Sequence, residues 1–192
     1  MPRASGWMLR RRGTGAMAAS SNNTISGWAI RYNAPTTIGG SWIEIVAPGA
    51  IKSLKDVTLL WSHDDDRPLA RTTSGTLQLR DEGRIGLYFS ADLDPSNPDA
   101  ALALSAIGRR DVVGMSYGFL IRKESWSEPK SYDELPIRTV LEMDVSEISA
   151  VVWPAFPQSE VHRSSDSMDN ASAARRRVVE KMERDQRLRG IR

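Results

Sequence analysis

A serine flanked by two glycines stands in the apolar run 111–121. The run is β-branched and aromatic and follows a helical pattern, so it predicts a strand. Side chains alternate faces along a strand, which puts Gly114, Ser116 and Gly118 on one face. Glycine within a strand often marks a close approach, so we expect room for a peptide beside Ser116. The other face is apolar, with Val113, Met115, Tyr117 and Phe119. The alternative interpretation is a β-bulge or a tightly packed corner of the sheet, in which the serine has no chemical role.

A serine nucleophile needs a base, because its hydroxyl is barely acidic at neutral pH, and histidine is the most frequent base. The chain has two histidines. His162 falls in a predicted polar tail, whereas His63 follows the predicted strand 56–61, at the point where an acidic loop begins. The strand period places His63 on the face of the apolar residues Val57, Leu59 and Trp61. His63 is therefore the candidate base, with a structural hydrogen-bonding role as the alternative.

A catalytic base needs a group that orients it, and three carboxylates lie in the predicted strand 137–152. They are Glu142, Asp144 and Glu147. Alternation places Glu147 in an otherwise small or apolar row, where a carboxylate must find a partner or protonate. The alternative is an edge-strand charge that faces solvent. The rest of that row is Val145, Ser149 and Val151.

The composition argues against several other chemistries. The chain has no cysteine, which excludes a thiol nucleophile, a disulfide scaffold and cysteine-based metal sites. His63 and the acidic residues 64–66 could bind a cation, but no second core histidine exists, so we predict neither a metal nor a cofactor. No glycine-rich phosphate loop precedes a helix, and no run approaches the ~18 apolar residues of a membrane span. Arg10–Arg12 lack a following apolar stretch, so no secretory signal is expected.

The net charge of +2 conceals a division between the middle and the ends of the chain. Residues 13–165 hold 14 Lys/Arg and 19 Asp/Glu, which gives −5, and the ends hold 12 and 5, which gives +7. A nucleic-acid surface on the core is therefore not expected. The basic ends are interpreted as arms, which often contact an acidic partner or nucleic acid.

The remaining pattern predicts a mainly β (α+β) fold, a single-domain β-barrel of about seven strands with a few surrounding helices and flexible basic tails. The strands are expected at 24–32, 41–46, 56–61, 69–79, 83–93, 111–121 and 137–152. A short helix is expected from Pro48 to Leu54, and a longer one from Asn97 to Arg110. Residues 123–136 are expected to be a flexible loop. We divide the chain into a disordered basic arm (1–23), the barrel domain (24–161), and a linker with a basic helical tail (162–192).

Four stretches, in this order along residues 24–161, resemble the prohead serine proteases of tailed bacteriophages. They are Gly27-Trp28-Ala29-Ile30 with Pro48-Gly49-Ala50, the strand 57–64 ending in His63-Asp64 with Pro68-Leu69, Gly114-Met115-Ser116-Tyr117-Gly118-Phe119, and Val145-Ser146-Glu147-Ile148-Ser149 with Pro154-Ala155. The sequence departs from the family pattern at Ala70, where glycine is common.

The resemblance implies a serine endopeptidase with a fold related to the herpesvirus assembly protease (assemblin), a β-barrel ringed by helices. It implies Ser116 as nucleophile, His63 as base and an acidic third member. The herpesvirus enzymes use a second histidine as the third member. This chain has no second core histidine, so the role is carried to Glu147, with Glu142 and Asp144 as alternatives. The oxyanion donors stay open between backbone N–H groups and an arginine, Arg109 or Arg110.

The resemblance also implies partners and a place of action. The substrates would be the scaffold part of the major capsid protein and the protease's own tail, cut by autocleavage in a possible homo-oligomer. The enzyme would act in the host cytoplasm, inside the assembling prohead, with no membrane involved. Two rival hypotheses are a non-catalytic assembly or scaffolding protein on the same barrel, and an unrelated β-barrel binding module.

Overall fold

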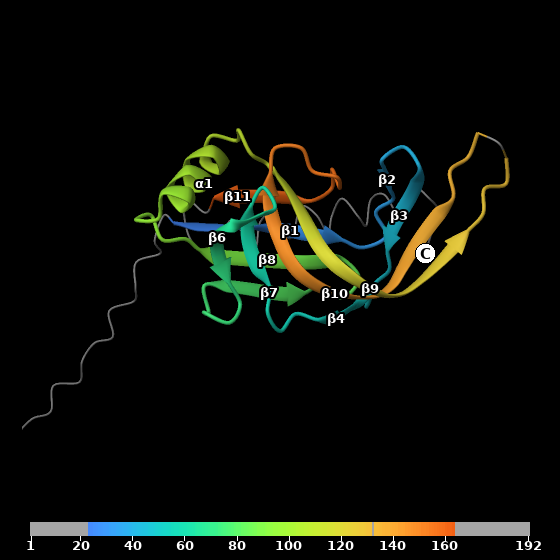
Figure 1. The fold of residues 1–192 in the computed structure, drawn as a ribbon, viewed down its shortest axis with the longest axis horizontal. Helices are drawn as coiled ribbons and strands as arrows, with labels where there is room; N and C mark the ends of the chain where they lie inside the picture. The colour runs from blue at the N-terminus through green and yellow to red at the C-terminus, as the bar shows by residue number, and fades with distance from the viewer. Residues whose placement is uncertain (1–22, 132, 164–192) are drawn as a thin grey trace, which may run out of the picture.

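The computed structural model describes residues 23–131 and 133–163, which form eleven strands and one helix (Figure 1). The predicted mainly β composition is confirmed. Most of the predicted basic arm 1–23 and of the tail 162–192 lies outside the described residues. The strands are β1 (Thr24–Arg31), β2 (Thr36–Ile38), β3 (Trp42–Val46), β4 (Ile51–Ser53), β5 (Thr58–Trp61), β6 (Asp64–Arg71), β7 (Leu77–Asp81), β8 (Gly86–Asp92), β9 (Gly114–Ser127), β10 (Ile137–Val151) and β11 (Glu160–Arg163); the helix is α1 (Pro98–Gly108).

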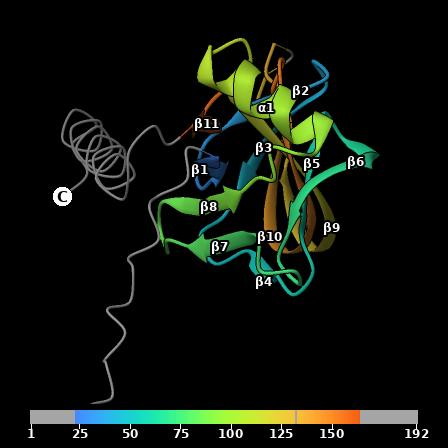
Figure 2. The ribbon, with the colours of Figure 1, turned by 90° about the vertical axis from the view of Figure 1, so that its left-hand side faces the viewer.

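The strands form two sheets, and no closed barrel is found in the described part of the chain. One sheet has the order β11-β1-β8-β7. In the other, β10 is the central strand, because it pairs in parallel with β3, β4 and β5 on one side and antiparallel with β9 on the other. Figure 2 shows the two sheets side by side with α1 across one end. The predicted count of about seven strands was too low, because β2, β4 and β11 form where no strand was predicted and the run 69–79 is divided between two strands.

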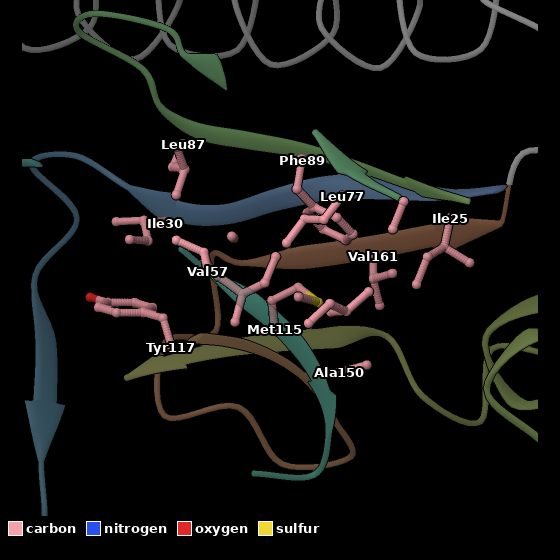
Figure 3. Close-up of a cluster of buried hydrophobic side chains, with 14 of the residues drawn as sticks. Ile25, Ile30, Val57, Leu77, Leu87, Phe89, Met115, Tyr117, Ala150 and Val161 are labelled. Atoms are coloured by element: carbon pink, nitrogen blue, oxygen red, sulfur yellow. The ribbon is translucent and has the colours of Figure 1, made fainter. Parts of the chain in front are cut away.

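The core lies between the two sheets and is formed by apolar side chains from both (Figure 3). Ile25, Leu87 and Phe89 of the smaller sheet are fully buried, as are Met115 and Ile148 of the larger one. Burial of such side chains contributes roughly 1.5–3 kcal/mol each. The face of the β9–β10 pair that carries Met115 and Ile148 therefore packs in the core. The opposite face of the pair is the one available for a functional site.

The segment after Pro48 is a turn followed by the strand β4, so the short helix predicted there is wrong. Gly49 has φ = +76°, a left-handed conformation that interrupts a helix. The Ala50 carbonyl then accepts a hydrogen bond from the Met143 N–H (2.8 Å). Pairing with the long strand β10 therefore overrides the local helical pattern.

Three other strands, β6, β7 and β9, differ from the sequence prediction. The acidic residues 64–66 begin β6 instead of forming a loop, and residues 69–79 are divided between β6 and β7, which belong to different sheets. β9 extends to Ser127 through part of the predicted loop 123–136, because it pairs with β10 along its length. Arg138 of β10 lies over Trp42 and Trp126 and pairs with the buried Glu44, which joins this extension to β3.

Helix α1 begins as predicted and closes one end of the molecule (Figure 2). The Asn97 side chain accepts from the Asp99 N–H (2.9 Å), and Pro98 occupies the first turn, where its missing N–H costs nothing. Arg67 of β6 donates to Asp99 (2.8 and 2.5 Å), which connects the helix to the sheet that carries His63.

Candidate active site

Ser116 lies on β9 opposite Ser149 of β10, and Gly118 lies opposite Glu147. Directly opposed residues of an antiparallel pair share a face, so these four residues form two adjacent rows on one face of the sheet. Met115 and Tyr117 point to the other face and are buried in the core, as the alternation predicts. Ser116 is 8% exposed. Tyr117 is no rival base, because burial raises the pKa of its phenol well above the ordinary value.

A β-bulge in β10 separates Val145 from the row that holds Glu147. Val145 pairs with Phe119 and Glu147 pairs with Gly118, which leaves Ser146 as the extra residue. The prediction that Val145 shares a face with Glu147 is therefore wrong, and Val145 is buried in the core. The bulge keeps the core face apolar on both sides of Ser146 and still presents Glu147 beside Ser116.

His63 does not continue strand β5 but occupies a tight two-residue loop. Trp61 pairs with Asp64, and the intervening Ser62 and His63 have φ values of 59° and 61°. Positive φ at both central positions is the conformation of a type I′ hairpin turn, uncommon for residues other than glycine. The predicted placement of His63 on the apolar face of β5 is wrong, because this turn reverses the chain before the strand period reaches it.

His63, Glu147 and Ser149 form one hydrogen-bonded cluster. His63 Nδ1 lies 2.8 Å from Glu147 Oε1, and the Ser149 hydroxyl donates to Glu147 Oε2 (2.7 Å) and accepts from the His63 backbone N–H (3.2 Å). An ionised carboxylate only accepts hydrogen bonds, so Nδ1 is the donor in this pair. In the neutral imidazole the lone pair is then on Nε2, the tautomer required of a general base. The His63 side chain is 46% exposed and that of Glu147 is 17% exposed.

Ser116 joins this cluster through its position and not through a direct bond. Among the described residues, no hydrogen bond links the Ser116 hydroxyl to the His63 ring. Ser149 lies opposite Ser116 on the neighbouring strand, and its hydroxyl accepts a hydrogen bond from the His63 backbone N–H. Ser116 and the His63 loop are therefore both neighbours of Ser149. Catalytic hydrogen bonds are often long without substrate and tighten when it binds.

The glycines beside Ser116 make room for side chains of this chain, not for a substrate as expected. A Cβ on Gly118 would lie 2.7 Å from Glu147 Oε1, and one on Gly114 would lie 2.5 Å from Cγ of Pro154. Both distances are shorter than real Cβ contacts allow. Gly118 thus leaves the space that the Glu147 carboxylate occupies while its Oε1 contacts His63.

The other candidate residues lie apart from this cluster. Asp144 accepts from Arg122 (2.8 and 2.5 Å), and Glu142 is opposite Lys123. His162 of β11 contacts Glu160 (Nε2–Oε2 3.3 Å), and Arg109 pairs with Asp111 (3.1 Å). Of the three carboxylates considered, Glu147 is the one in contact with His63.

Two buried serines that the sequence reasoning gave no role support the site. One is Ser149. The other is Ser159, whose hydroxyl accepts from the Met115 N–H (3.3 Å) and contacts the carbonyls of Met115 and Phe156. Ser159 thus fixes the backbone next to Ser116. Alternation alone placed Ser149 beside Glu147, whereas no local pattern pointed to Ser159, which follows a proline-rich turn.

Within residues 23–131 and 133–163, no group of three or more His, Asp or Glu side chains is arranged to hold a metal ion. The single described helix, α1, has 11 residues and is too short to cross a membrane. In comparisons with known proteins, residues 11–174 match a family model described as caudovirus prohead serine protease. The search of curated proteins found no match.

Proposed function

The chain belongs to the caudovirus prohead serine proteases, and on that premise we propose a capsid-maturation endopeptidase that acts through Ser116, His63 and Glu147. The observation that carries the assignment is the 2.8 Å contact between His63 and Glu147 beside the Ser116 strand. It supplies the oriented base that a serine nucleophile requires. Glu147 takes the acidic role in preference to Glu142 and Asp144, which have other neighbours.

In the proposed mechanism, Ser116 Oγ attacks the carbonyl carbon of the scissile peptide while His63 Nε2 accepts the hydroxyl proton. Glu147 stabilises the resulting imidazolium through Nδ1. Collapse of the tetrahedral intermediate breaks the C–N bond, and His63 gives its proton to the leaving amine. Water, deprotonated by His63, then hydrolyses the acyl-enzyme and restores Ser116. Glu147 stays ionised throughout, because it orients the ring and does not carry the proton.

The proposed substrates are the scaffold part of the major capsid protein and this chain's own basic tail. Both would be met inside the assembling prohead in the host cytoplasm. The division of charge supports the tail as an arm, because residues 171–192 hold 8 Lys/Arg while the middle of the chain is acidic. Deletion of residues 166–192 should reduce incorporation into procapsids, and unchanged incorporation would refute the arm.

Co-expression with the cognate major capsid protein tests the assignment. The wild-type chain should yield shortened capsid protein on a denaturing gel, and Ser116→Ala should leave it full-length. Ser90→Ala, on β8 of the other sheet, is a matched control that should cleave normally. Persistent cleavage by Ser116→Ala would favour a different nucleophile, and assembly that needs the chain but shows no cleavage with either protein would favour the scaffolding hypothesis.

A further inference from the structure

Ser149 is completely buried and lies at the centre of the cluster around His63. On β10 it has Ser116 opposite it on β9 and Leu60 opposite it on β5. Its hydroxyl has one proton, which is donated to Glu147 Oε2, and it accepts the His63 backbone N–H. A buried hydroxyl that donates to one residue and accepts from another links those two residues and is not a free group.

The loop that carries His63 needs such a link. Its two residues hold left-handed conformations, and strained backbone persists only where the surroundings fix it. The Ser62 N–H donates to the Ala150 carbonyl (3.1 Å), and the His63 N–H donates to Ser149. Two consecutive residues of β10, Ser149 and Ala150, therefore hold the two residues of this loop. Ala150 accepts with its backbone carbonyl, and Ser149 accepts with its side-chain hydroxyl.

The carboxylate of Glu147 needs orientation as well. It has two oxygens, and a rotation about its last side-chain bond would exchange them or turn both away from His63. The bond from Ser149 occupies Oε2, which directs Oε1 towards Nδ1 of His63. A hydrogen bond to a charged acceptor is among the stronger ones in proteins.

We infer that Ser149 is a positioning residue that sets the His63 loop and the Glu147 carboxylate together, so that the imidazole keeps its proton on Nδ1. This inference rests on the proposed function of Ser116, His63 and Glu147. Ser149 is not itself the nucleophile, because its hydroxyl is fully buried and donates to Glu147.

Nitrogen-15 labelling of histidine in the full chain gives a readout that a merely structural role would not move. The chain has only two histidines, and His162→Gln identifies the signals of His63. In the wild type, the ring proton should lie on Nδ1 and the His63 amide should exchange slowly. In Ser149→Ala, part of the ring proton should move to Nε2 and amide exchange should accelerate. Ser26→Ala, another buried serine but on β1, should leave both unchanged.

The rate at which a small fluorophosphonate labels Ser116 measures the reactivity of its hydroxyl, and this reagent does not depend on contacts with a peptide substrate. Ser149→Ala should lower this rate by about 10- to 100-fold, because a bond to a charged group is lost. Unchanged His63 signals in Ser149→Ala would overturn the inference. Fast exchange of the His63 amide in the wild type would overturn it even if Ser149→Ala did not fold. Labelling that survives Ser116→Ala would instead refute the proposed nucleophile.

Discussion

Replacement of Gly118 by alanine tests the contact between the two strands of the site. The added Cβ would lie 2.7 Å from Glu147 Oε1, 3.0 Å from Cγ and 3.3 Å from Cδ. Ordinary contact begins near 3.4 Å, so the carboxylate must move by about 3.4 − 2.7 = 0.7 Å. Glu147 Oε1 is also the acceptor of His63 Nδ1, and any such movement disturbs that bond.

The size of the effect follows from this displacement. A misplacement of about 1 Å in a catalytic constellation lowers the rate roughly 100-fold, so a shift of this size should lower kcat about 10- to 100-fold. Stability should change by less than about 1 kcal/mol. The strain falls on the end of a flexible side chain, and alanine in a strand recovers ~0.5–1 kcal/mol relative to glycine. KM should stay near its wild-type value, because substrate contacts are not altered.

The assay is steady-state cleavage of a peptide spanning the capsid cleavage site, with urea unfolding measured in parallel. Comparison with Gly114→Ala on the same face of β9 provides the matched variant, since there the obstacle is a proline ring and not the carboxylate. Full activity in Gly118→Ala would refute the reasoning, because it would mean that the placement of Glu147 does not govern the base. A large loss of stability would refute it as well.

Three further outcomes are expected. Glu147→Gln should lower kcat by roughly 100- to 10,000-fold in the peptide assay, since the amide no longer stabilises the imidazolium, while Glu142→Gln should match the wild type; the reverse result would transfer the acidic role to Glu142. Gly114→Ala should destabilise the fold by about 1–3 kcal/mol in urea unfolding, because a proline ring cannot rotate away; an unchanged midpoint would contradict the close packing. The hydrogen bond with His162 lowers the pKa of Glu160 from its ordinary value of 4.5. The ionised Glu160 side chain should therefore stabilise the fold above pH 4.5, and this contribution should disappear as the pH falls through the lower folded-state pKa. Glu160→Gln should accordingly lose less stability on acidification than the wild type, which is checked by thermal melting at a series of pH values.

The strand that carries Ser116 was predictable because one simple period governs it. Alternation along β9 correctly separated Ser116 and its glycines from Met115 and Tyr117. The helix start at Asn97 was predictable for a similar reason, since capping is a local property of a few residues. Such features need no knowledge of which segments meet in space.

The features that complete the site depend on pairing and could not be predicted. The left-handed loop at His63 and the bulge at Ser146 each interrupt the period from which the faces were assigned. The role of Gly118 appears only once Glu147 is known to lie opposite it. The composition of the larger sheet likewise depends on β10 taking partners along both of its edges, including the short strand β4 that its local sequence presented as a helix.

The most direct test of the central claim is the site at which a fluorophosphonate modifies the full-length protein, read by mass spectrometry of its peptides. Ser116 should carry the single phosphonyl group in the wild type, and His63→Ala should remove the modification. A phosphonyl group on any other serine, or equal labelling of Ser116 without His63, would contradict the assignment.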